Sequence, residues 1–151
     1  ISKGLVGSEM CIRDRFIPYI ENDITQFARI DICNVGGITE SMKVAGWCES
    51  HYIDMMPHNP LGPICTAASI HYGASVPNFA WLETRESSAE NAGFFDDEII
   101  QSSHKMQNAM YVVSDEPGLG IKVNEDYLRN SKFKQWDPPQ LERNDGSVTN
   151  W

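Results

Sequence analysis

Apolar and polar residues alternate with two different periods along the first half of the chain. Residues 27–32 alternate with a period of two, which is typical of a β-strand. The predicted strand has one charged face and one apolar face, formed respectively by Phe27, Arg29 and Asp31 and by Ala28, Ile30 and Ile32. After the break at Gly36 and Gly37, apolar residues recur every three or four positions, which predicts an amphipathic helix. Its expected apolar stripe is Ile38, Met42, Ala45, Cys48 and Tyr52.

The same succession repeats once more. Residues 53–58 predict a second strand, which stops at a proline-rich turn. Pro63 suits the first turn of a helix that continues to Ala74, and residues 78–84 predict a third strand. Strands that alternate with helices indicate an α/β fold built from parallel βαβ units.

The chain is more acidic beyond Arg85, and its periodic pattern weakens. We expect a loop over residues 91–98, a strand near 110–113, a turn over 116–120 and a short helix over 124–129. The chain thus divides into a first segment of residues 1–15, βα units over 16–86 and a C-terminal return segment over 87–151. Within the first segment, GLVGSEMCIRD resembles the translation of a sequencing adapter, so we expect residues 1–15 to be adapter-derived and non-native.

Charge and composition exclude several classes of partner. The net charge of −9 disfavours nucleic acid and anionic membrane surfaces. The longest uncharged stretch, residues 55–82, contains four prolines and therefore fails as a membrane-spanning helix. Four irregularly spaced cysteines without a secretory signal favour reduced thiols and a cytoplasmic location.

Three ionisable residues lie at or beside the carboxyl ends of the three predicted strands. They are Asp31, His58 and Glu83, and their separation is close to the length of one βα unit. In a (β/α)₈ barrel such strand ends meet at one face, so we expect these groups to form a catalytic pocket. An aspartate beside a histidine can fix the imidazole tautomer for acid/base work. The alternative is that the two carboxylates cap helices and His58 is structural.

The remaining histidines carry weaker signals. Cys48 and His51 have half of a zinc-ligand spacing with no second pair. We expect His71 to be a hydrogen-bonded core residue and His104 to be solvated.

Five segments together resemble a known superfamily. In chain order they are RIDICNVGGITESMKVA, MPHNPLGPICTAASIH, PNFAWLET, EPGLGIKVNED and DGSVTNW. They resemble the mandelate racemase subgroup of the enolase superfamily, and within it the galactonate dehydratase-like sugar-acid dehydratases. The resemblance implies that residues 16–86 are about strands 6 to 8 of a (β/α)₈, TIM-like barrel, followed by the return segment.

The resemblance also implies roles for the three strand-end residues. Asp31 and His58 match the family's Asp–His dyad, and Glu83 matches the acid at the end of the eighth strand. Mg²⁺ is the implied cofactor, with its ligands upstream of this chain and no metal ligand within it. Many family members have Gln-Pro before the aspartate, where this chain has Arg29-Ile30, so a cationic side chain is expected to alter the pocket.

The implied activity is that of a hydro-lyase. Such an enzyme removes the proton α to a carboxylate of a small sugar acid and eliminates water, which yields a 2-keto-3-deoxy acid. We expect the full-length protein to be a homo-oligomer, and the chain alone to be inactive because the metal-ligand strands are missing. The alternatives are a non-catalytic truncated barrel segment and a racemase or cycloisomerase of the same superfamily.

Overall fold

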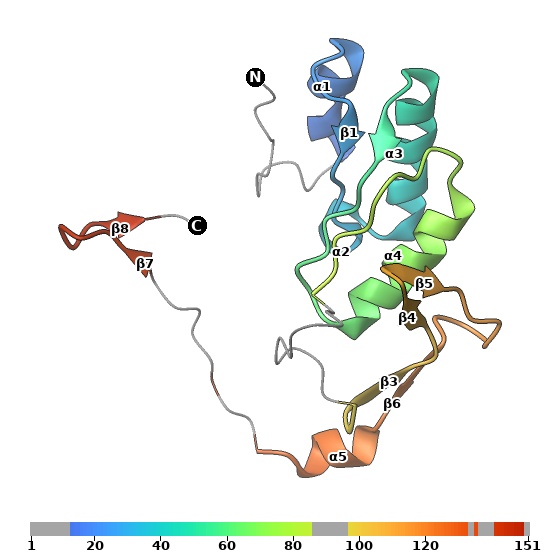
Figure 1. The fold of residues 1–151 in the computed structure, drawn as a ribbon, viewed down its shortest axis with the longest axis vertical. Coiled ribbons are helices and arrows are strands. Elements are labelled where there is room, and N and C mark those ends of the chain that lie inside the picture. The colour runs from blue at the N-terminus through green and yellow to red at the C-terminus, as the bar shows by residue number, and fades with distance from the viewer. Residues whose placement is uncertain (1–12, 86–96, 133–134, 136–140, 150–151) are drawn as a thin grey trace.

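The computed structural model describes residues 13–85, 97–132, 135 and 141–149 (Figure 1). Its first part contains short strands and longer helices in alternation. The elements are η1 (Arg13–Phe16), α1 (Ile17–Glu21), β1 (Phe27–Ala28), α2 (Ile32–Val35), α3 (Ile38–Ser50), β2 (Asp54–Met55) and α4 (Pro63–Ser75). The second part begins with strands and has one short helix. Its elements are β3 (Ile100–Ser102), β4 (Lys105–Gln107), β5 (Met110–Val112), β6 (Ile121–Val123), α5 (Glu125–Asn130), β7 (Leu141–Glu142) and β8 (Val148–Thr149).

Three extended segments run parallel to one another in the first part. β1 pairs with β2, and a parallel bridge joins Met55 of β2 to Phe79. Backbone hydrogen bonds continue past the regular strands, because His58 N–H donates to the Ile30 carbonyl (2.7 Å) and Glu83 N–H donates to the Pro57 carbonyl (3.3 Å). The predicted parallel arrangement is therefore confirmed, although the regular strands are shorter than the predicted ones.

The segment after β1 turns into a helix earlier than the alternation predicts. Asp31 is the N-cap of α2, and its carboxylate accepts from the backbone N–H groups of Cys33 and Asn34. Residue 32 therefore belongs to α2 and not to a strand. Gly36 ends this helix with a φ of 111°, a left-handed conformation that a side chain would strain.

The buried stripe of helix α3 coincides with the predicted one at Ala45 and Cys48 and differs from it elsewhere. Its buried residues are Ser41, Val44, Ala45 and Cys48. Three residues of the predicted stripe are exposed instead, namely Ile38, Met42 and Tyr52, the last at 97%. Tyr52 lies beyond the end of the helix with a positive φ of 57°, so the helical period no longer applies to it.

Helix α4 begins at Pro63 as predicted and packs against α2 and α3. Figure 1 shows α3 and α4 along the parallel segments. Their apolar faces and the alternate residues of β1 form one core. That core includes Phe16, Ile20, Ala28, Ile30, Val44, Met55 and Tyr72.

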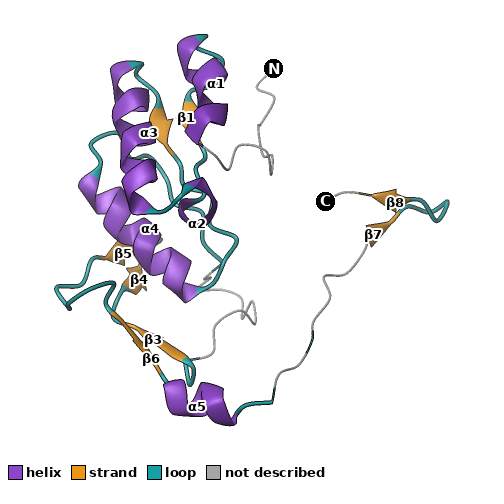
Figure 2. Ribbon diagram, turned by 180° about the vertical axis from the view of Figure 1, so that it is seen from behind, coloured by secondary structure: helices purple, strands orange, loops and turns teal. Residues whose placement is uncertain are grey.

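The C-terminal part consists of antiparallel strand pairs and one short helix. β3 pairs with β6, β4 with β5 and β7 with β8. Figure 2 shows the β3–β6 ribbon beside α5, on the side of α4 away from α1. The predicted strand near 110–113 and helix over 124–129 correspond to β5 and α5. The predicted loop over 91–98 lies mostly outside the described residues.

The predicted division at residue 15 stays a prediction, since residues 1–12 lie outside the described part. Arg13, inside the predicted adapter-derived segment, forms an ion pair with Glu40 of α3 at 2.8 Å. In the described part of the chain, the helices are too short or too polar to cross a bilayer.

The changed face of α3 leads to a stability prediction. Val44 is fully buried, whereas Met42 is 38% exposed. Val44→Ala should lower the free energy of unfolding by about 2 kcal/mol through lost burial and a small cavity. Met42→Ala, in the same helix, should lower it by less than about 1 kcal/mol. Urea unfolding of the two variants measures both values, and a larger loss for Met42→Ala would restore the face predicted from the sequence.

Candidate active site

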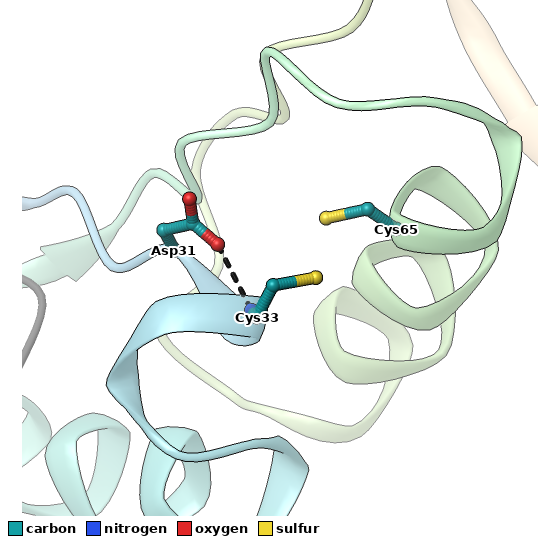
Figure 3. A group of neighbouring side chains, drawn as sticks. All are labelled: Asp31, Cys33 and Cys65. Carbon is teal, nitrogen blue, oxygen red and sulfur yellow. Dashed lines mark hydrogen bonds between the residues drawn. The ribbon is translucent and has the colours of Figure 1, made fainter.

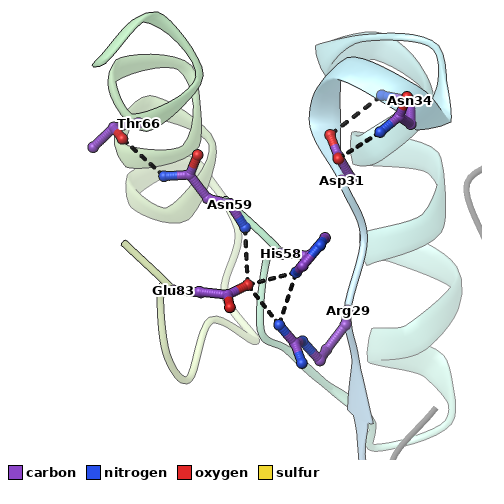
Figure 4. Close-up of polar contacts among 7 residues, drawn as sticks. All are labelled: Arg29, Asp31, Asn34, His58, Asn59, Thr66 and Glu83. Atoms are coloured by element: carbon purple, nitrogen blue, oxygen red, sulfur yellow. Dashed lines mark hydrogen bonds and ion pairs between the residues drawn. The ribbon is translucent and has the colours of Figure 1, made fainter. Parts of the chain in front are cut away.

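Arg29, His58 and Glu83 meet at one edge of the parallel segments (Figure 4). Arg29 Nη2 donates to Glu83 Oε2 at 2.5 Å, and His58 Nδ1 lies 2.5 Å from the same oxygen. The backbone N–H of Asn59 donates to this oxygen as well, at 3.1 Å. Two segments, one after β1 and one after β2, thus deliver three donors to a single carboxylate oxygen.

His58 Nδ1 faces both a donor and an acceptor in this cluster. Arg29 Nη2 lies 2.8 Å from it, and a guanidinium nitrogen can only donate. Glu83 Oε2 lies 2.5 Å from the same nitrogen, and an ionised carboxylate can only accept. Nδ1 therefore accepts from Arg29 in one tautomer and donates to Glu83 in the other. In the second tautomer, Nε2 of the neutral ring is the unprotonated nitrogen.

Charge and burial have opposite effects on Glu83. Burial alone would raise the pKa of its carboxyl, but Arg29, His58 and the Asn59 N–H together hold this pKa below its ordinary value of 4.5. The side chain remains 39% exposed, against 30% for His58 and 19% for Arg29. The cluster is thus a half-buried ionised site in contact with solvent.

Asp31 lies at the same edge but turns towards α2 (Figure 4). Its carboxylate accepts from Cys33 N–H (2.9 Å), Asn34 N–H (3.3 Å) and Asn34 Nδ2 (2.6 Å). Among the described residues, no hydrogen bond joins Asp31 to His58. The structure therefore brings together His58 and Glu83 of the three predicted site residues, and shows Asp31 in the capping role that the sequence left open.

Asn59 fixes the turn that carries His58. It is fully buried, and its Nδ2 donates to Thr66 Oγ1 of α4 at 2.8 Å. Its own N–H faces Glu83, so the side chain and the backbone of one residue tie the turn to two neighbouring segments. Sequence reasoning did not select Asn59. Arg29 was expected on the polar face of the strand, with a cationic side chain that alters the pocket, and its ion pair with Glu83 agrees with that expectation.

A second polar group lies beside the first turn of α4 (Figure 3). One oxygen of Asp31 and the sulfur atoms of Cys33 and Cys65 all lie within 4.8 Å of one another. Burial raises the pKa of the Cys65 thiol to about 12, and the adjacent Cys33 thiol adds to this effect. Two thiols are soft donors and do not fit Mg²⁺, which prefers oxygen ligands. Among the described residues, no other group of three ligand-type side chains is this close together.

Two of the other histidines differ from expectation. His104 is 3% exposed rather than solvated, and it bonds to the Leu119 carbonyl and the Ser114 N–H. His71 packs edge-on against it, with ring centroids 5.0 Å apart. Within the described residues His71 Nε2 is buried without a hydrogen-bond partner, so this histidine is not fully satisfied.

Comparison with known families decides the relationship of this fold. The model of the enolase C-terminal domain-like family matches residues 5–127. The chain belongs to that family. The match begins inside the segment predicted to be adapter-derived and ends within α5.

Enolase-family relatives of this chain include two kinds of sugar-acid dehydratase. The chain is 30% identical to a D-galactonate dehydratase of Cronobacter sakazakii, over 96% of this chain and 39% of that protein. It is 28% identical to a D-mannonate dehydratase of a Sphingomonas species, over 87% of this chain and 32% of that protein. The chain thus spans about a third to two fifths of the length of these relatives.

Solved structures of the superfamily share the fold. An enolase of Agrobacterium radiobacter, crystallised with sodium and L-malate, superimposes with a TM-score of 0.74 at 26% identity, over 91% of this chain and 37% of that one. An enolase of Pantoea ananatis with bound D-gluconate and magnesium gives a TM-score of 0.64 at 29% identity, over 75% of this chain and 26% of that one.

The lowered pKa of Glu83 predicts a pH dependence of stability. A carboxyl with a lowered folded-state pKa stabilises the fold above its unfolded pKa, and this contribution disappears as the pH falls through the folded value. Wild type should therefore exceed Glu83→Gln in stability at neutral pH, and the gap should close below about pH 4.5. Urea unfolding of both proteins from pH 7 to pH 3 measures the gap, and a gap that is constant over this range would contradict the ionised cluster.

Proposed function

We propose that this chain is the C-terminal part of a sugar-acid dehydratase of the enolase superfamily. The reaction removes the proton α to the substrate carboxylate and eliminates water, and the product is a 2-keto-3-deoxy acid. The single observation that supports it most is the contact of His58 Nδ1 with Glu83 at the edge of parallel strands, in a family whose named relatives here are dehydratases.

The proposal places the three parallel segments as about strands 6 to 8 of a (β/α)₈ barrel. Ala28 and Ile30 face the helices and are buried, whereas Arg29 between them faces the polar cluster. In such a barrel, alternate strand residues point to the helices and to the interior, and strand ends build the active site. The alternation of these three residues supports the proposed barrel wall.

His58 is the proposed acid/base group. In the proposed active tautomer Nδ1 donates to Glu83, so Nε2 is left to take the α-proton from the substrate or to return a proton to the leaving hydroxyl. Arg29 keeps Glu83 ionised, and an ionised carboxylate favours the tautomer that donates to it. Glu83 is then the orienting carboxylate, a role that the family resemblance gives to Asp31.

Asp31 stays a proposed catalytic residue, as the partner of His58 in the dyad that the family resemblance implies. Its carboxylate is committed to the N-terminus of α2, so a dyad with His58 would require it to leave those donors. Replacing it by Asn separates the two roles, because Asn caps helices about as well as Asp but carries no charge.

The proposed cofactor of the whole enzyme is Mg²⁺. The described residues do not fit it, because the one compact group of ligand-type side chains contains two thiols. Its ligands would come from residues outside this chain, and none of the proton steps assigned to His58 is derived from the metal.

The 151-residue chain alone should show no dehydratase activity. A dianionic enediolate needs several carboxylates to hold a stabilising metal, and the described residues do not supply them. Keto-acid formation from a panel of aldonic acids, measured with purified chain and Mg²⁺, checks this expectation. Turnover by the isolated chain would show that the catalytic apparatus is complete here and would refute the proposed division.

In the full-length enzyme, His58→Asn should lower kcat by about 10²–10⁴-fold, because Asn cannot exchange the proton. His51→Asn is the matched control, since His51 lies at the end of α3, outside the cluster. Asp31→Asn should leave kcat close to wild type if Asp31 only caps α2, and should lower it if the dyad operates. Steady-state kinetics with an aldonate that the wild type dehydrates decide these outcomes. Near wild-type kcat in His58→Asn would refute the assignment.

A further inference from the structure

Two cysteines and one aspartate converge from different elements of the fold. Asp31 and Cys33 lie at the start of α2, and Cys65 is in the first turn of α4. Figure 3 shows both thiols pointing into the space between these helices. The ligand atoms of all three residues lie within 4.8 Å of one another.

We propose that Asp31, Cys33 and Cys65 bind a thiophilic divalent cation of the Zn²⁺ type, with two sulfur ligands, one carboxylate oxygen and one open position. This site differs from the proposed magnesium site in its residues and in its donor atoms. It does not depend on the proposed dehydratase reaction.

The spacing of the three atoms suits tetrahedral coordination. Zn–S bonds of about 2.3 Å and Zn–O bonds of about 2.0–2.2 Å separate neighbouring ligand atoms by roughly 3.5–3.8 Å. The three ligand atoms lie at most 4.8 Å apart, so side-chain movements of about 1 Å bring them to this geometry. Cys33 is exposed and has room for this movement, whereas Cys65 is buried on α4.

Burial keeps Cys65 a neutral thiol in the metal-free site, so a bound cation has to displace its proton. Cys65 lies in the first turn of α4, where the partial positive charge of the helix N-terminus offsets part of this cost. Asp31 is already oriented by its three hydrogen bonds to Cys33 and Asn34, as carboxylate ligands commonly are by neighbouring donors. These bonds leave lone pairs on its oxygens free for a cation.

The donor set determines which cation is selected. Thiolates prefer Zn²⁺ and other soft or borderline ions, whereas Mg²⁺ takes hard oxygen ligands. Cys48 provides the contrast within the same fold. It is fully buried in the core of α3, and among the described residues it has no ligand-type side chains grouped around it.

The test uses the full 151-residue chain, reduced with a phosphine, with Cys11→Ser in every protein so that this thiol cannot contribute. Cd²⁺ is the probe, because its thiolate complexes absorb in the ultraviolet. We expect one equivalent of Cd²⁺ to produce this band, Zn²⁺ to displace it, and millimolar Mg²⁺ to leave it unchanged. Absence of the band, or its loss on addition of Mg²⁺, would overturn the proposal.

Single substitutions then locate the site. Cys33→Ser and Cys65→Ala should each weaken Cd²⁺ binding by at least about tenfold. Removing a residue that only hydrogen-bonds to a metal ligand already weakens binding by about this factor, and removing the ligand itself should weaken it more. Asp31→Asn should weaken binding while preserving the helix cap. Cys48→Ala is the matched control and should bind as tightly as the parent.

The exposed position keeps the test independent of folding. Cys33 is exposed, so Cys33→Ser should retain the helical circular dichroism of the parent and report on binding alone. Parental affinity in Cys33→Ser, or an equal loss in Cys48→Ala, would show that the cation binds elsewhere. Either result would leave the assignment of His58 and Glu83 unaffected.

Discussion

Backbone hydrogen bonds between three parallel segments determine where the polar side chains of this protein meet. Ala28 and Ile30 accept from the second segment, at 2.9 and 2.7 Å, and the second segment accepts from the third at Pro57. Parallel strands present their carboxyl ends at one edge, so residues more than twenty positions apart arrive at the same level. The contact between His58 and Glu83 is a direct consequence of this register.

The two sides of these segments have opposite requirements. One side is covered by α3 and α4 and contains apolar residues such as Ile30, Val44 and Tyr72, which supply the burial that orders the segments. The other side carries Arg29 and Glu83, which stay partly exposed and neutralise each other. An unpaired charge there would be costly to desolvate, whereas the observed pairing keeps the carboxyl ionised and the histidine oriented.

Asp31 connects the two polar groups at this edge. It follows the buried Ile30 and caps α2, which places it next to Cys33 and Cys65 rather than in hydrogen-bond contact with His58. One group therefore contains charged nitrogen and oxygen atoms suited to proton transfer, and the other contains sulfur suited to soft cations. The N-terminus of α2, which Asp31 caps, thus lies between the histidine cluster and the thiol group.

The order of strands and helices, the start of α4 at Pro63 and the polar face carrying Arg29 could all be predicted from the sequence, because they depend on local period and on proline geometry. Membership of the enolase superfamily was also evident from short segments. The periodic pattern also identified Ala45 and Cys48 of the buried face of α3, but not Ser41 and Val44. The rest of that face and the burial of His104 could not be predicted, since both depend on which neighbours cover them. The partner of His58 was likewise decided by tertiary structure. Asp31 and Glu83 both lie at strand ends, and only the competition between an adjacent helix N-terminus and the Arg29–His58 pair selects which carboxylate reaches the imidazole.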